Sequence, residues 1–105
     1  MFVLPAARLT GLPGHVADAA ALEGIRGLVK SAARQWGREG ITVNALTVRS
    51  HHDALDTRSR FASAIGRSVD VRADVAGVVS LLAMSDADAV TGATLGVDGG
   101  LLMLP

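Results

Sequence analysis

The chain has 105 residues, half of them hydrophobic, and its ten basic residues balance ten acidic ones. This composition predicts one folded domain and disfavours disorder or a nucleic-acid partner, which would favour a basic excess. The absence of cysteine excludes disulfides and cysteine-type zinc sites, and no apolar run approaches the roughly 20 residues of a membrane helix. We therefore expect a cytoplasmic protein without a signal peptide.

The hydrophobic pattern predicts alternating strands and helices. Short apolar or β-branched runs indicate buried strands, and apolar residues at three- and four-residue spacing indicate helices. Glycine and proline mark the turns between them. The expected elements are a strand over 2–4 stopped by Pro5, a turn over 10–14, a helix over 15–37 ended by Gly37 and Gly40, a strand over 41–48, a loop with a short helix over 49–68, a helix over 73–86, and a strand over 93–97 followed by the turn DGG.

The order of these elements predicts the fold class. In the helix over 73–86, Asp74 is a candidate N-cap. The apolar face of this helix comprises Val75, Val78, Val79 and Leu82. Helical connections of this length join parallel strands by right-handed crossovers. We expect a single α/β domain over 1–105, with about three parallel strands and flanking helices in a partial Rossmann-like, doubly wound fold.

Three segments resemble the C-terminal half of the short-chain dehydrogenase/reductase family. Residues 2–4 resemble its fifth strand, and residues 20–46 resemble its central helix and sixth strand. Residues 74–100, which contain VTG and VDGG, resemble its last helix and last strand. The resemblance implies the fold of NAD- or NADP-dependent oxidoreductases, whose dinucleotide lies mainly on a glycine-rich turn of the N-terminal half. No G-x-G-x-x-G motif occurs in this chain. We expect no cofactor on the isolated chain, and NAD(P) only if a partner supplies the other half.

The resemblance also gives the positions of the family's catalytic serine, tyrosine and lysine, and all three are replaced. The Tyr-x-x-x-Lys pair falls on His15 and Ala19, and no serine occurs between 1 and 30. The chain has no tyrosine, and its single lysine, Lys30, lies about four helical turns beyond His15. We therefore expect no catalytic residue. A surface histidine at a helix start is the preferred interpretation of His15, and a replacement acid is the alternative.

The residues after the second predicted strand are weak candidates for cofactor contacts. The family has Pro-Gly there, where its backbone approaches the nicotinamide, whereas this chain has Val48 and Arg49, followed by Ser50. Arginine in the place of glycine disfavours ordinary seating of a cofactor. Residues 51–53 (HHD) are interpreted as a solvated loop, so no metal site is expected.

The first helix has two candidate contact faces. A basic stripe at four-residue steps is interpreted as a solvated face with Glu23 and Glu39 nearby, rather than as a site for an acidic partner. Its members are Arg26, Lys30, Arg34 and Arg38. A face rich in small residues is expected to pack on the sheet and also on a helix of another subunit, as in the family. The candidate interface residues are Ala21, Ile25, Leu28, Ala32 and Trp36.

A sheet of three parallel strands has an uncovered edge, which is a template for pairing with another chain. Because the first strand begins at the initial methionine, we expect that a partner supplies further strands or that the chain is a fragment. The first hypothesis is a degenerate, non-catalytic structural or regulatory subunit, in a homo-oligomer or beside a related active subunit. The alternatives are an NAD(P)-dependent oxidoreductase component that is active only with a partner chain, and a truncated gene product.

Overall fold

The computed structural model describes residues 1–49, 63–67 and 69–103. Its centre is a parallel sheet in which β2 lies between β1 and β3. The strands are β1 (Phe2–Pro5), β2 (Ala45–Val48) and β3 (Thr94–Val97). This arrangement confirms the expected α/β fold with parallel strands.

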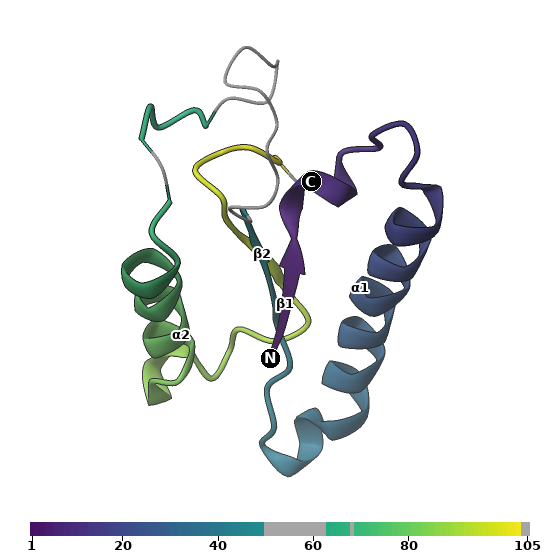
Figure 1. Ribbon diagram of the computed structural model, residues 1–105. Helices are drawn as coiled ribbons and strands as arrows, with labels where there is room; N and C mark the ends of the chain where they lie inside the picture. Colours follow the sequence, from purple (N-terminus) through teal and green to yellow (C-terminus); the bar gives the residue numbers. More distant parts are fainter. Residues whose placement is uncertain (50–62, 68, 104–105) are drawn as a thin grey trace.

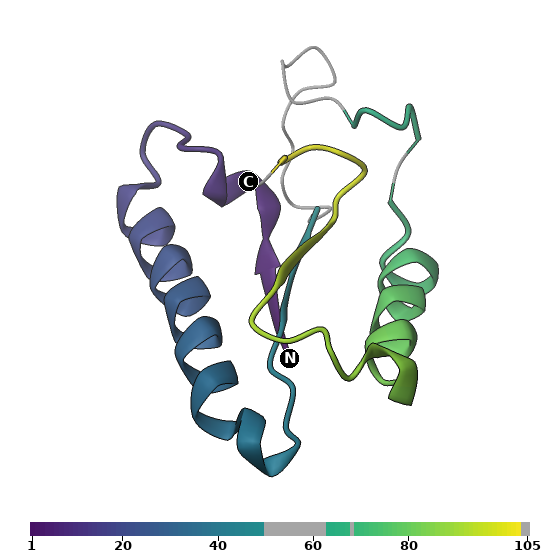
Figure 2. The same ribbon diagram turned by 180° about the vertical axis from the view of Figure 1, so that it is seen from behind.

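Two α-helices flank the sheet. The long helix α1 (Val16–Trp36) lies on one side and the shorter α2 (Ala76–Leu82) on the other, as Figures 1 and 2 show from opposite directions. Both views therefore show the sheet as a middle layer, which is the layering of a doubly wound fold. Short helical turns complete the described elements: η1 (Ala6–Leu9), η2 (Gly37–Glu39), η3 (Val71–Val75, a π-helical turn) and η4 (Ser85–Ala87).

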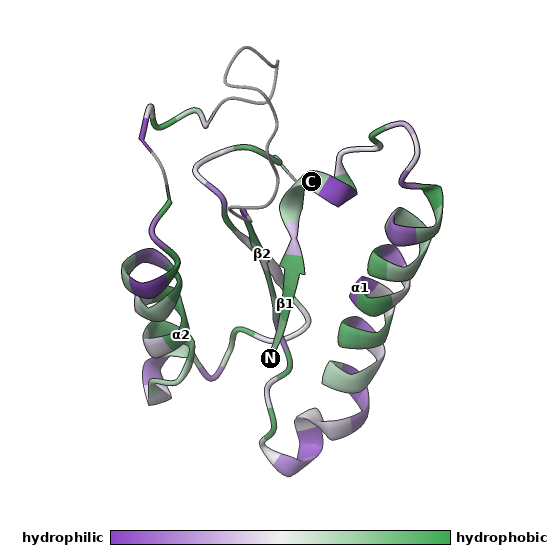
Figure 3. Ribbon diagram, in the orientation of Figure 1, coloured by the Kyte–Doolittle hydropathy of each residue, from purple (hydrophilic) through white to green (hydrophobic). Residues whose placement is uncertain are grey.

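The core lies on both faces of β2, whose four residues are all buried. Alternation along an extended chain sends successive side chains to opposite faces. On the α1 face, the buried cluster comprises Leu4, Val29, Ala32, Ala33, Val43 and Ala45. On the α2 face, it comprises Leu46, Val48, Val69, Val75 and Val97, with the predicted residues Val78, Val79 and Leu82 packed against it. Figure 3 accordingly shows the central strands as mostly hydrophobic.

The second strand is shorter than the predicted range 41–48, because side-chain hydrogen bonds hold its first part. Val43 N donates to Thr91 Oγ1 at 3.0 Å, and Asn44 Nδ2 donates to the carbonyl of Val90 at 2.7 Å. Asn44 Oδ1 also accepts from Ala93 N at 3.1 Å. Together with the backbone bond from Gly92 N to Val43 O at 2.7 Å, they tie the chain before β2 to the segment before β3.

The predicted helix over 73–86 is wrong at both ends. It is preceded by the turn η3, and the cap is Asp70, whose side chain accepts from the N–H groups of Arg72 and Ala73. Asp74, the predicted cap, instead accepts from Arg67 at 2.7 and 2.9 Å and from Asp70 N at 2.8 Å. The α-helix proper ends at Leu82.

The predicted ends of α1 hold within one residue. Gly40 is the residue that reverses the chain, with φ of +76°, whereas Gly37 keeps a right-handed helical conformation. Most of the loop expected over 49–68 lies outside the described residues, and its described part, 63–67, contains a turn and no helix. Neither α-helix of the described chain has the length and apolar character needed to cross a membrane.

Candidate functional site

The residues that directly follow the three strands lie at the carboxyl edge of the sheet, where ligands bind in open α/β folds. β1 continues into η1, β2 into Arg49, and β3 into the turn that begins at Asp98. The start of α1 faces η1 at this edge. The candidate site predicted from the sequence therefore lies where the fold class would place a ligand.

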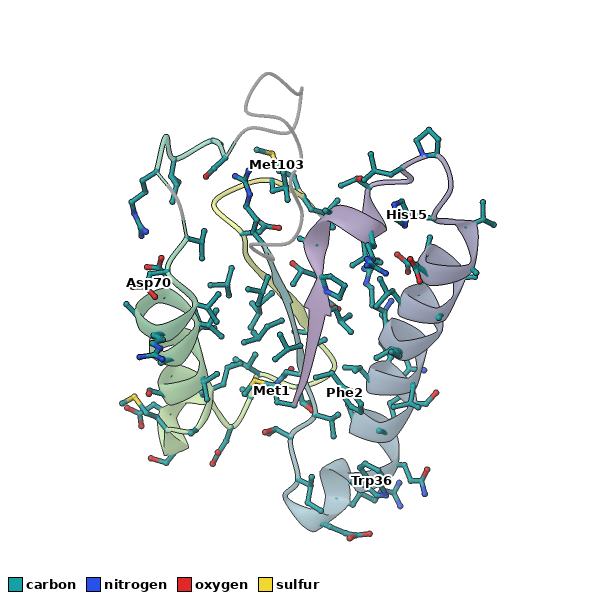
Figure 4. All side chains as sticks on the ribbon, in the orientation of Figure 1. Met1, Phe2, His15, Trp36, Asp70 and Met103 are labelled. Atoms are coloured by element: carbon teal, nitrogen blue, oxygen red, sulfur yellow. The ribbon has the colours of Figure 1, made fainter. Side chains whose placement is uncertain are left out.

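His15 is the N-cap residue of α1, and its imidazole is part of a charged cluster. His15 Nδ1 lies 3.1 Å from Asp18 Oδ2, and Arg8 Nη1 donates to the same oxygen at 2.7 Å. Arg8 belongs to η1, so the cluster joins the end of β1 to the first turn of α1. Figure 4 shows the His15 ring directed from the helix start toward η1.

The electrostatics of this cluster fix which ring nitrogen carries hydrogen. The hydrogen bond from His15, together with the Arg8 guanidinium, lowers the pKa of Asp18 below its ordinary value. An ionised carboxylate can only accept hydrogen bonds, so His15 Nδ1 is the donor and Nε2 of the neutral ring keeps its lone pair. Nε2 is therefore the ring nitrogen that is available to another group.

Ala19, which the resemblance aligned with the family's lysine, carries no charge. Ala19 is half-buried on α1, and Lys30 is exposed eleven residues further along the helix. The basic group nearest to His15 in the cluster is Arg8, which is paired with Asp18. The cluster at the start of α1 therefore consists of a histidine, a carboxylate and a guanidinium.

Arg8 and Asp18 were missed in the sequence analysis. The i, i+3 spacing of His15 and Asp18 at a helix start is a local signal that could have identified the pair. Arg8 gives no such signal, because ten residues separate it from Asp18 and only the fold brings the two together. All three side chains are partly exposed to solvent.

The glycine pair after β3 does not leave open space for a dinucleotide. Gly99 and Gly100, with φ of +70° and +80°, are the glycine pair at the carboxyl edge, but the chain itself fills the space beside them. A Cβ atom on Gly99 would collide with Ser63 Oγ, and one on Gly100 would lie 2.8 Å from the Cβ of Ala64. NAD(P) therefore does not fit these residues in the way that it fits a glycine-rich phosphate turn.

The weak candidates for cofactor contacts are only partly covered by the structure. Val48 is buried in β2 and packs against α2, and Arg49 is half-buried directly after that strand. Ser50 and the HHD segment over 51–53 lie outside the described residues. Within residues 1–49, 63–67 and 69–103, no three histidine or acidic side chains gather as a metal site would require.

The predicted interface residues divide between two environments. Ala32 is buried in the core and Ile25 packs against it, so both contact the sheet. Ala21, Leu28 and Trp36 are exposed, and the Leu28 side chain is 50% exposed. Three of the five candidates are therefore available to another chain.

The basic stripe on α1 is less uniform than predicted. Lys30, Arg34 and Arg38 are exposed, as a solvated face requires. Arg26 is instead half-buried, and its Nη1 donates to both carboxylate oxygens of Glu23 at 2.8 and 3.0 Å. The stripe therefore consists of three exposed charges and one half-buried charge that is paired with Glu23.

A cavity of about 240 Å³ lies on the opposite side of the sheet, away from His15. Four apolar side chains line it together with the paired Arg67 and Asp74. The lining residues are Ile65, Arg67, Val69, Asp74, Val78, Val97 and Gly99. The hydrogen bond from Arg67 lowers the pKa of Asp74 to about 2, so this pair is ionic at neutral pH. No site residue predicted from the sequence contributes to this cavity.

Comparison with known sequences identifies an oxidoreductase family. The family model described as enoyl-(acyl carrier protein) reductase matches residues 6–102. A curated relative, the 2,3-dihydroxy-2,3-dihydro-p-cumate dehydrogenase of Pseudomonas putida strain F1, is 36% identical over 105 aligned positions, which cover 90% of this chain and 40% of the relative. The chain thus spans about two fifths of the length of this relative.

Solved structures give the same answer for the fold. A mutant of a Serratia marcescens short-chain dehydrogenase/reductase matches with a TM-score of 0.72 at 28% identity, over 94% of this chain and 43% of that one. A 4-hydroxyisoleucine dehydrogenase in complex with NADH and succinate matches with a TM-score of 0.68 at 24% identity, over 94% of this chain and 42% of that one. The described fold therefore corresponds to about two fifths of a complete enzyme chain.

Proposed function

The chain belongs to the short-chain dehydrogenase/reductase family, and we propose that it acts as a non-catalytic structural or regulatory subunit within an oligomer. In this proposal residues 1–105 form one domain that corresponds to the C-terminal half of the family fold. Further strands come from another copy or from a related active subunit. The absence of cysteine supports a cytoplasmic location, because disulfide bonds rarely form there.

The free edge of β1 is the observation that carries this proposal. β1 pairs with β2 alone in the described sheet. Phe2 N donates to Asn44 O at 2.9 Å, so the alternation of a parallel ladder turns the N–H of Val3 away from β2. Phe2 is 36% exposed and Val3 is 59% exposed. An apolar edge with outward backbone groups supports pairing with a further strand.

The outer face of α1 supports association through a second surface. Ala21 and Gly24 are exposed together with Leu28, on a flank of the helix beside the residues that pack on the sheet. Small residues beside an exposed leucine permit close approach of another helix. The occupant that we propose for this face is the α1 helix of a second SDR-type subunit.

The replaced catalytic residues support the non-catalytic part of the proposal. A positioned general acid contributes about 10²–10⁴ in rate, and no tyrosine is present to provide it. The test for nucleotide binding is a titration of the chain with NADH and with NADPH, in which nicotinamide fluorescence reports binding. We expect no saturable binding, and micromolar affinity of this chain alone would contradict the proposal.

A second candidate function is a component of an NAD(P)-dependent oxidoreductase whose dinucleotide is held by a partner chain. The pair of His15 and Asp18 favours this candidate, because an oriented imidazole can serve as an acid or base toward a substrate oxygen. Reconstitution with a nucleotide-binding partner tests it. Activity that His15→Ala abolishes and Arg38→Ala leaves unchanged would support the candidate, whereas activity that is unaffected by His15→Ala would contradict it.

The remaining alternative is a truncated gene product without its own role. Sequencing of the DNA directly upstream tests it. An in-frame segment that encodes a glycine-rich strand-turn-helix would assign the chain to a longer polypeptide and would replace the subunit proposal.

A further inference from the structure

The turn after β3 begins with an Asp-Gly pair, Asp98 and Gly99, and aspartate is most prone to isomerisation when glycine follows it. In this reaction the main-chain nitrogen of the glycine attacks the side-chain carbonyl carbon, Cγ, of the aspartate. Glycine has no Cβ atom to hinder the approach, and it adopts the backbone conformations that ring closure requires. The sequence contains no second Asp-Gly pair, so Asp98 is the aspartate of this chain with the greatest intrinsic tendency to isomerise.

Three backbone N–H groups hold the Asp98 carboxylate in the folded chain. Oδ1 accepts from Gly100 N at 2.9 Å and from Leu101 N at 3.1 Å, and Oδ2 accepts from Leu102 N at 3.2 Å. Both oxygens are therefore engaged, and neither can leave Cγ without loss of its hydrogen bonds. Asp98 is also 1% exposed, so water has little access to the reacting atoms.

A second segment of the chain holds Gly99, whose nitrogen would make the attack. Ser63 Oγ donates to the Gly99 carbonyl oxygen at 2.9 Å, and Ile65 N donates to the same oxygen at 3.2 Å. Ring closure brings the Gly99 nitrogen onto Cγ and turns the remaining carboxyl oxygen into the plane of the ring, so the reacting groups must first reach that geometry. The hydrogen bonds on both residues oppose this movement.

We propose that Asp98 is a latent site of isoaspartate formation, which the anchored turn over 98–102 protects and which reacts when this turn opens. A bond forms between Gly99 N and Asp98 Cγ, and the amide proton and the hydroxyl group of the protonated carboxyl leave together as one water molecule. Water then adds to the Asp98 main-chain carbonyl carbon and breaks its bond to Gly99 N, which leaves isoaspartate. The reaction needs no oxidant and no reactant other than water.

Isoaspartate makes the opening of the turn permanent. The main chain then runs through Cβ and Cγ, so it gains one methylene group, and the new carboxylate is attached directly to Cα, away from the N–H groups of residues 100–102. The turn carries Leu101, which packs against Ala6 and Ala7 of η1 at the carboxyl edge of the sheet (Figure 1). Its loss therefore detaches this segment from the edge. The inference depends neither on the β1 edge nor on oligomer formation, so it stands or fails apart from the proposed function.

A comparison of the folded and the unfolded chain tests the proposal. The unsubstituted chain is incubated at neutral pH, in buffer and in urea above its unfolding midpoint. Isoaspartate at Asp98 is followed by peptide mapping and by methylation with an isoaspartyl methyltransferase. We expect the rate in urea to exceed the rate in buffer by at least about tenfold, the ratio that corresponds to about 1.4 kcal/mol of protection. Equal rates would overturn the proposal, and this comparison depends on no variant.

The substitution Ser63→Ala tests the anchor without changing the reacting dipeptide. It removes the hydrogen bond to Gly99 O, whose net contribution of about 1 kcal/mol corresponds to about fivefold in the population of the open turn. We therefore expect isoaspartate to form about fivefold faster in buffer and at an unchanged rate in urea. Ser80→Ala, at an exposed position of α2, is the matched control and leaves both rates unchanged. A rate in buffer that is the same for Ser63→Ala as for this control would overturn the proposal.

Discussion

β1 and β2 are both short apolar strands, but their surroundings differ. β2 has a neighbour on each side, helices over both faces and no exposed residue. β1 has one neighbour, and the first two of its four residues are exposed. Two strands of similar apolar composition therefore differ in burial: β2 lies in the core, whereas β1 has an exposed edge in the described sheet.

This difference gives the two strands different roles. A strand buried on both faces contributes to the stability of the chain itself. An apolar strand with a free edge contributes most when another strand covers it. We therefore expect substitutions in β2 to affect folding and substitutions at the outer edge of β1 to affect association.

The largest expected effect is that of Leu46→Ala in β2. Leu46 is fully buried between Val48 and the residues of α2, so its truncation leaves a cavity. We expect a loss of about 2–5 kcal/mol in the free energy of unfolding. Urea denaturation followed by circular dichroism measures it. A loss no larger than that of Val3→Ala at the β1 edge would break the contrast between the strands.

The next effect is that of Val3→Lys at the outer edge of β1. A lysine on an edge strand opposes pairing with another strand, whereas the exposed site tolerates it within the folded chain. We expect loss of self-association, measured by sedimentation velocity, with an unchanged circular dichroism spectrum. Val3→Thr, which keeps the β-branched shape without a charge, is the control and is expected to associate as before. Association that persists with lysine would show that the edge is not used.

A smaller effect is expected from Leu28→Glu on the outer face of α1. The side chain is exposed, so we expect the free energy of unfolding to change by no more than about 0.5 kcal/mol. Association through α1 should weaken, which a dilution series in sedimentation equilibrium measures. Lys30→Glu, a control on the same helix, makes a larger change of charge. A similar weakening by both substitutions would point to charge rather than to packing.

The smallest effect concerns the exposed ion pair of Arg67 and Asp74. The pKa of Asp74 is lowered from 3.8 to about 2 in the folded chain. Its contribution to stability is therefore complete above pH 4 and is lost as the pH falls through 4 toward 2. Asp74→Asn should remove this part of the acid dependence, as measured by unfolding midpoints between pH 2 and 5. An identical acid dependence in the variant would contradict the assignment.

The sequence predicts an element well where a regular hydrophobic pattern extends over many residues. It predicts the ends of an element less well where side-chain hydrogen bonds determine them. Twenty-one residues of regular spacing predict α1 to within one residue at each end. The start of β2 was wrong because the Asn44 side chain takes bonds that a strand ladder would otherwise make. The predicted N-cap of the second helix was wrong, because Asp70 and Asp74 are both suitable capping residues in the sequence. Only the fold shows that Arg67 binds the Asp74 carboxylate and leaves Asp70 as the cap.

The candidate site was predictable only in part. His15 and Ala19 follow from the resemblance, and the exposure of Leu28 follows from helix periodicity once the sheet face is known. The contact between Arg8 and Asp18 joins two segments whose approach depends on the turn between β1 and α1.

The central claim is that the β1 edge is completed by another chain. Size-exclusion chromatography with light scattering on the purified 105-residue chain tests it most directly. Each chain has a mass of 10.7 kDa, so the claim predicts a stable species at a multiple of this mass. A soluble and fully folded monomer of 10.7 kDa would contradict it.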